Sequence, residues 1–217
     1  MPQPKSSSFS KSTEKVILKQ VKSFLNHIRP ETTYWKGKHT WGEMVDFRGT
    51  FTKRKSKDGF GELDQIEILK WGGINRFTHF ELMKGGLKEL HENNLSFDTY
   101  SRISSLSKLF SFYNPDKFFI LDARVALTIN HLICKENTGD LCIPFKPSKS
   151  KGKKVKAALE KFQGEAMFDD LGQAYLAYNS LVLSIFNNIS IPNGLPNKPE
   201  IIEMAIFSIA DKIVSGD

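Results

Sequence analysis

Apolar residues recur at helical spacing along most of this chain, with polar residues on the opposite faces. Residues 12–28 place Ile17, Val21 and Leu25 on one face with lysines opposite, and Pro30 ends the pattern. The same spacing returns from about residue 80. It predicts six further helices, over 80–93, 99–112, 123–134, 153–164, 168–188 and 199–214. The pattern therefore predicts a mostly α protein.

Residues 34–80 have a different character, because glycine, aromatic and basic residues alternate there without a clear period. The segments "FRGTF" (47–51) and "LDQIEILKW" (63–71) fit short strands or irregular loops, and "KRKSKDGFG" (53–61) between them is typical of a turn or hairpin tip. We therefore expect a polar tail over 1–12, an N-terminal helix with a small irregular or β segment over 13–79, and a helical lobe over 80–217.

The charge of the chain narrows the class of partner. The 217 residues include 31 Lys and Arg against 24 Asp and Glu, a net charge of +7. Such a balance is common among small basic proteins, and it also suits a polyanion such as nucleic acid.

The cysteines and histidines do not point to a metal site. Cys134, Cys142 and five scattered histidines have neither disulfide-framework nor metal-site spacing, so we expect no metal and no cofactor. No apolar run or leader-like N-terminus is present, and we expect a cytoplasmic, monomeric protein that does not contact a membrane.

One stretch, "SKLFSFYNPDKFFILDARVALTI" (107–129), combines features that point to chemistry. Lys108 lies on an apolar helix, and the apolar run 118–121 ends abruptly in Asp122. A purely structural interpretation places Lys108 on the wet edge of an amphipathic helix and makes Asp122 the N-cap of the helix over 123–134. A nuclease reading would pair Asp116 with a later acidic-x-Lys motif. It is disfavoured, because the nearest match, Glu67 to Lys70, lies upstream and has one residue too many.

The same stretch resembles the active-site segment of the helix-hairpin-helix DNA glycosylase superfamily, in particular its 8-oxoguanine DNA glycosylase-like branch. In that family a Gly-Val-Gly-x-Lys hairpin opens a helix whose lysine is the nucleophile, and an apolar segment then ends in a catalytic aspartate. Here Ser107-Lys108 stands for the hairpin end, "FFIL" for the apolar segment and Asp122 for the aspartate. The segments "YLAYN" (175–179) and "EIIEMAIF" (200–207) are also similar to later helices of bacterial members. The residues before Lys108 lack the usual glycines, and the Lys108-to-Asp122 spacing of 14 residues is shorter than in the family.

The resemblance implies a helix-hairpin-helix glycosylase-like lobe that excises a flipped, modified base from double-stranded DNA, either oxidised guanine or a modified base of foreign DNA. It implies Asp122 and Lys108 as catalytic residues, with a Schiff base on Lys108 allowing strand cleavage. Candidate phosphate contacts are Arg102, Arg124, Lys149, Lys151, Lys153 and Lys154, and candidate base-pocket residues are Phe112, Tyr113, Tyr175 and Tyr178. Tyr175 and Tyr178 could instead simply pack in the core. The alternative function is a non-catalytic DNA-binding or interaction protein that retains the fold.

Overall fold

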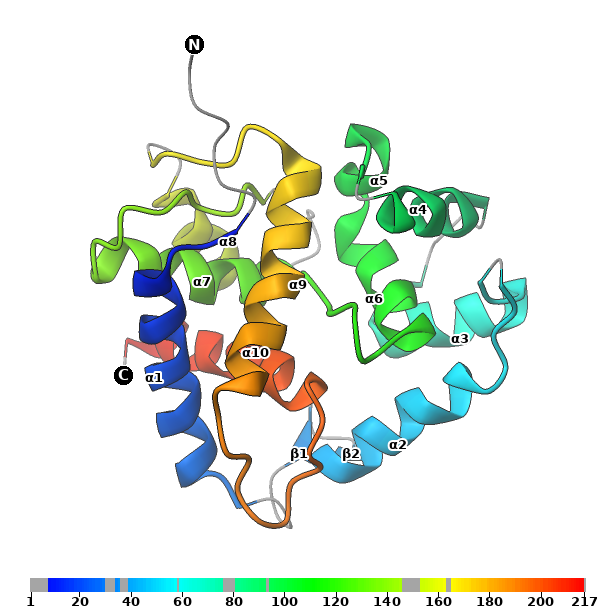
Figure 1. Ribbon diagram of the computed structural model, residues 1–217, viewed down its shortest axis with the longest axis horizontal. Helices are drawn as coiled ribbons and strands as arrows, with labels where there is room; N and C mark the ends of the chain where they lie inside the picture. The colour runs from blue at the N-terminus through cyan, green and yellow to red at the C-terminus, as the bar shows by residue number, and fades with distance from the viewer. Residues whose placement is uncertain are drawn as a thin grey trace.

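A computed structural model describes residues 8–29, 34–35, 39–57, 59–75, 81–92, 94–145, 153–162 and 165–216. These residues form helices joined by loops, with one pair of very short strands (Figure 1). The elements are α1 (Lys11–His27), β1 (Tyr34–Trp35), β2 (His39–Thr40), α2 (Trp41–Thr52), α3 (Glu62–Trp71), α4 (Glu81–His91), α5 (Phe97–Ser101), α6 (Ile103–Tyr113), α7 (Ala123–Lys135), α8 (Lys153–Glu160), α9 (Leu171–Asn187) and α10 (Glu200–Ser215). The prediction of a mostly α protein is confirmed.

The helices pack in two groups (Figure 1). In one group α10 packs along α7, and α1, α8 and α9 surround this pair. In the other group α6 is the central helix, and α2, α3, α4 and α5 pack against it. The chain between α6 and α7 (114–122) passes from the second group to the first. Within the described part of the chain, no helix is both long and apolar enough to span a bilayer.

The expectation of irregular or β structure over 34–80 is wrong for most of the residues that the structure describes. "FRGTF" lies inside α2, and "LDQIEILKW" forms nearly all of α3. Thr40 and Glu43 start α2 with a capping box, in which each side chain bonds the backbone N–H of the other residue. The helical pattern was hidden because two buried positions, Arg48 in α2 and Gln65 in α3, carry polar side chains.

The turn expected over 53–61 is present, but it joins two helices rather than two strands. Ser56 and Gly59 exchange backbone hydrogen bonds of 2.8 and 3.2 Å. Gly59 has a φ of 112°, which only glycine adopts without strain. The β structure is limited to the antiparallel pair β1–β2 among the described residues.

The single helix expected over 99–112 is two helices. Ser96 caps α5 by accepting the Thr99 N–H, and α5 ends after one turn at Arg102, whose φ of −111° and ψ of 12° leave the helical range. Ile103 then starts α6. The helices expected over 153–164 and 168–188 are shorter, at 153–160 and 171–187. The helix expected over 199–214 is present over 200–215, with Pro199 as its N-cap.

Candidate functional site

Asp122 lies at the N-terminus of α7 and acts as its cap. Its Oδ1 atom accepts hydrogen bonds from the backbone N–H groups of Arg124 (2.9 Å) and Val125 (3.3 Å). The residue is only 3% exposed, and Leu121 and Ala123 on either side are fully buried. The positive end of the helix dipole and the two N–H donors stabilise a negative charge on this carboxylate. The structural interpretation of Asp122 as the N-cap of α7 is therefore confirmed.

The apolar run before Asp122 is an extended, buried segment that belongs to no strand. Its backbone polar groups must still be paired, because an unpaired buried amide is costly. Side chains from three helices supply the partners. The pairs are Phe119 N–H to Asn179 Oδ1 (2.9 Å), Tyr175 O–H to Phe119 O (3.0 Å), Ile120 N–H to Glu203 Oε2 (3.0 Å), Tyr178 O–H to Ile120 O (3.0 Å), Leu121 N–H to Ser107 Oγ (3.1 Å) and Ser107 O–H to Leu121 O (3.3 Å).

Tyr175 and Tyr178, two of the predicted base-pocket residues, belong to this network. Both rings are completely buried on α9, and their hydroxyls donate to the backbone of the apolar segment. Burial raises the pKa of each phenol, so both hydroxyls remain protonated donors. The two tyrosines thus pack in the core and position the segment, which was the alternative reading of their spacing.

A buried ion pair holds the same segment from the other side. Arg48 of α2 donates to both carboxylate oxygens of Glu203 on α10, at 2.8 and 3.0 Å, and the two side chains are 0% and 1% exposed. Glu203 also accepts the Ile120 N–H. Because one carboxylate serves both partners, α2, α10 and the apolar segment are fixed together. No signal in the sequence points to this pair, because its members lie 155 residues apart.

Lys108 is buried on α6 and is 1% exposed. Its aliphatic stem lies against Gly72 at the end of α3, so closely that a Cβ atom at Gly72 would come within 2.4 Å of the lysine Cδ atom. Its ammonium nitrogen donates to the carbonyl oxygen of Ser104, one turn earlier on the same helix. The lysine therefore does not lie on the wet edge of an amphipathic helix, as the structural reading of the sequence had placed it.

Lys108 and Asp122 lie on chain segments that contact each other. Ser107, next to Lys108, makes both of its hydrogen bonds with the backbone of Leu121, next to Asp122. The chain after α6 therefore folds back along the helix. Because Lys108 and Asp122 are only 14 residues apart, they can act at one site only if the chain returns in this way.

The predicted phosphate-binding residues are spread over several elements. Arg102 is exposed at the junction of α5 and α6, and Lys153 and Lys154 are exposed at the start of α8. Arg124 forms an ion pair with Asp211 of α10 at 2.7 Å, and its guanidinium lies 4.9 Å from the ring centre of Phe207. Lys149 and Lys151 lie outside the described residues.

Phe112 and Tyr113, the other two predicted base-pocket residues, lie at the end of α6 near α2. Phe112 is fully buried, with ring centres of Phe51 and Trp71 at 5.3 and 5.1 Å. Tyr113 is half-buried and donates its hydroxyl to the Lys57 carbonyl. Phe112 therefore fills the core, and neither residue lines the cavity described next.

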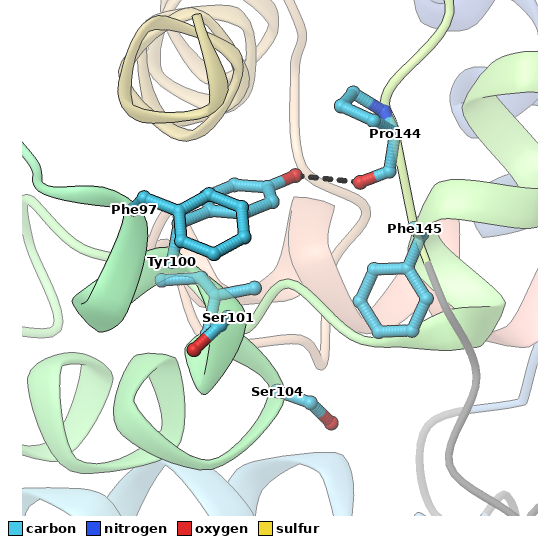
Figure 2. A pocket seen from close by; sticks show the side chains of 7 residues that line it. Phe97, Tyr100, Ser101, Ser104, Pro144 and Phe145 are labelled. Atoms are coloured by element: carbon cyan, nitrogen blue, oxygen red, sulfur yellow. Dashed lines mark hydrogen bonds between the residues drawn. The ribbon is translucent and has the colours of Figure 1, made fainter.

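A cavity of about 370 Å³ lies between α5, the start of α6 and the loop after α7 (Figure 2). It is lined by Phe97, Tyr100, Ser101, Ile103, Ser104, Pro144 and Phe145. Its volume lies at the lower end of the range of about 300–1,000 Å³ that is usual for small-molecule sites. None of these residues was predicted as a site residue, although Phe97 and Tyr100 lie one turn apart and Phe145 directly precedes a lysine-rich stretch.

Comparisons of the chain with protein-family models, with curated proteins and with solved structures find no match. Among the described residues, no group of three His, Cys, Asp or Glu side chains is arranged to hold a metal ion. Cys134 and Cys142 are free thiols whose sulfur atoms lie 3.7 Å apart.

Proposed function

We propose that this protein is a DNA glycosylase that excises a modified base from double-stranded DNA, with Asp122 acting on the sugar. The observation that carries the proposal is the contact between Ser107 and Leu121, which brings the chain around Lys108 beside the chain around Asp122. The resemblance of residues 107–129 to the active-site segment of helix-hairpin-helix glycosylases supports it, as does the net charge of +7. Oxidised guanine is the leading substrate, and a modified base of foreign DNA is the second.

The chemistry requires a carboxylate next to the sugar carbon of a flipped nucleotide. Breaking the bond between C1′ and the base leaves positive charge on the sugar, and a nearby carboxylate stabilises that charge. Asp122 is held by two backbone N–H groups among apolar residues, so water screens its field poorly.

Whether the reaction includes strand cleavage depends on whether Lys108 acts as a nucleophile. An unprotonated lysine amine can attack C1′ as the base leaves with the bonding electron pair, and opening of the sugar ring then gives an imine that permits β-elimination. In the structure the amine is bonded to the Ser104 carbonyl and would have to leave that oxygen to reach a sugar. In the alternative, monofunctional route, Asp122 activates a water molecule and Lys108 supports the fold.

The proposal is tested with a panel of duplexes that each carry one modified base, scored for abasic sites. Asp122→Asn should lose about 10²- to 10³-fold in excision rate, because one charge at the transition state is removed, while duplex binding persists. Asp170→Asn is the matched control, since Asp170 caps α9 in the same way but is exposed. Excision by Asp122→Asn at the wild-type rate would remove Asp122 from the chemistry.

Borohydride trapping tests the lysine. A Schiff base would be reduced to a stable protein–DNA adduct, and Lys108→Gln should abolish that adduct. Lys117→Gln is the control, because Lys117 lies nearby in the chain and is exposed. Excision by the wild type without any adduct would indicate the monofunctional route.

A second candidate is a non-catalytic DNA-binding protein. It is favoured by one observation, namely that Asp122 and Lys108 are both buried and both bonded to backbone groups, as structural residues are. In this case duplex binding would persist, and no base of the panel would be released.

A further inference from the structure

We propose that the cavity between α5 and the Pro144–Phe145 loop is the pocket that receives the flipped base, and that the base stacks on Phe97. This inference rests on the proposed function and adds the substrate pocket to it. It replaces the predicted pocket residues, of which Phe112, Tyr175 and Tyr178 fill the core.

The walls of the cavity suit a flat aromatic ring. Figure 2 shows Phe97 and Tyr100 on one side and Pro144 and Phe145 on the other. Phe97 is 70% exposed, and it is one of two large apolar residues in the described part of the chain that are so exposed, the other being Leu63. Stacking of a base on an aromatic side chain does not depend on the identity of the base, and it covers apolar surface that would otherwise face water.

The cavity is preformed, because both walls are anchored to the core. The Tyr100 hydroxyl donates to the Pro144 carbonyl at 2.8 Å and so joins the two sides. Burial raises the pKa of Tyr100, which keeps this hydroxyl a donor. Asn130 bonds both the N–H and the carbonyl of Ile143, at 2.7 and 2.9 Å, and fixes the loop that carries Pro144 and Phe145. A rigid pocket loses little entropy when a base enters it.

The cavity is connected to the proposed catalytic residues by one face of α6. Ser104 lines the cavity, and Ser107 and Lys108 follow it at helical spacings of three and four residues. The rise between Ser104 and Ser107 is about 4.5 Å along the helix axis. Ser107 holds Leu121 beside Asp122, and Lys108 bonds the Ser104 carbonyl. A base and its C1′ atom are directly bonded, so the pocket and the catalytic groups must be neighbours, and α6 carries residues of both.

Basic residues follow the cavity wall in the sequence, and they suit an occupant that carries phosphates. In the sequence, Phe145 is followed by five lysines within the nine residues 146–154. Lys153 and Lys154 of this stretch are exposed. A nucleotide within a DNA strand combines an aromatic ring with flanking phosphates, which matches aromatic walls that basic residues follow in the sequence.

The first experiment measures binding of a free base in the cavity, and it does not require catalysis. The free base 2-aminopurine is fluorescent, and stacking quenches it. Titration of the wild type with this base should give saturable quenching. Ser101→Trp should abolish it, because Ser101 is an exposed cavity residue and the indole would fill the space. Ser101→Ala is the matched control and should bind like the wild type, and circular dichroism confirms that each variant is folded.

The second experiment measures excision from the duplex panel. Ser101→Trp should lose about 100-fold or more in kcat/KM, because the base can no longer reach its position. Phe97→Ala should lose about 5- to 150-fold, as expected for one stacking partner. Leu63→Ala, at the other exposed apolar residue, should change excision less than about 2-fold. Nonspecific duplex binding should persist in all variants.

The outcomes separate the two proposals. Quenching by the wild type that is lost in Ser101→Trp supports the pocket, whatever the duplex panel shows. If no base of the panel is released, only the glycosylase function is overturned. Excision by Ser101→Trp at the wild-type rate would overturn the pocket while the function stands. Absence of quenching in the wild type would also overturn the pocket.

Discussion

The hydroxyl group of Ser107 is bonded to both backbone polar groups of Leu121, accepting from its N–H at 3.1 Å and donating to its carbonyl at 3.3 Å. A hydroxyl can do both, since it is a donor and an acceptor at once. For Leu121, this single side chain therefore replaces the strand neighbour that a residue of an extended, buried segment would normally have. It also fixes where the chain that ends in Asp122 lies along α6.

Ser107→Ala should lower the free energy of unfolding by about 1–3 kcal/mol, because it leaves a buried N–H and a buried carbonyl without this partner. Urea denaturation measures the change. Ser111→Ala is the control in the same helix. Its hydroxyl donates only to the Lys108 carbonyl one turn back, and its loss should cost less than about 1 kcal/mol. Equal effects of the two substitutions would mean that the Leu121 contact contributes little.

Gly72→Ala should destabilise the protein by about 1–3 kcal/mol through a clash with Lys108. The backbone of Gly72 has a φ of −71°, which alanine adopts freely, so the clash with the lysine stem is the main cost. In the double variant Gly72→Ala/Lys108→Ala the cost should be smaller than the sum of the single costs by more than about 0.5 kcal/mol. Thermal and urea unfolding of the four proteins give this coupling.

Gly85→Ala provides the contrast for that experiment. Gly85 lies inside α4 and has open space where a Cβ atom would be placed. Alanine there should stabilise the protein by about 0.5–1 kcal/mol, since it only raises helix propensity. If the unfolding free-energy changes of Gly72→Ala and Lys108→Ala simply add in the double variant, the close packing of Gly72 and Lys108 is contradicted.

The sequence predicted those elements whose stability depends on a regular apolar face. The helices α1, α4, α7 and α10 follow from such faces, and Asp122 was identified as a cap from its position before α7. The helices α2 and α3 were missed because Arg48 and Gln65 occupy buried positions with polar side chains. A buried arginine looks like a surface residue until its partner is known.

The candidate site was predictable only where it is local in sequence. The stretch that holds Lys108 and Asp122 could be read directly, because both residues lie within one short segment. The cavity could not, since Tyr100 and Pro144 lie 44 residues apart and meet only through the packing of α5 on the loop after α7. The same holds for Arg48 and Glu203, which lie 155 residues apart and meet only in the folded chain.

Asp211→Asn should strengthen nonspecific duplex binding if Arg124 contacts phosphate, because it releases the guanidinium from its carboxylate. Arg124→Gln should weaken binding and reduce the slope of log K against log salt by about one. Fluorescence anisotropy at several salt concentrations measures both. Glu92→Gln is the charge-matched control, since it removes the carboxylate from the exposed pair with Lys88. If Asp211→Asn and Glu92→Gln have equal effects, only net charge matters.

Glu200 should make the protein less stable as the pH rises towards neutrality. Burial raises its pKa from 4.5 to about 7, with Glu203 and Asp116 adding to the shift and Arg48 and Lys198 opposing it. Between these two values the unfolded chain has lost the Glu200 proton, while the folded protein still holds it. Unfolding is therefore increasingly favoured as the pH rises through this window, by up to about 1.4 kcal/mol per pH unit and roughly 3 kcal/mol in total.

Glu200→Gln should remove this dependence, because glutamine is neutral in both states and keeps the shape of the protonated acid. The stability of the variant relative to the wild type should therefore increase from pH 4.5 to pH 7 by roughly 3 kcal/mol. Urea denaturation at both pH values measures the difference. Glu62→Gln is the matched control, since Glu62 is also the first residue of its helix but is exposed, and its difference from the wild type should change little over this range. Parallel pH profiles of wild type and Glu200→Gln would show that Glu200 titrates alike in the folded and unfolded chains.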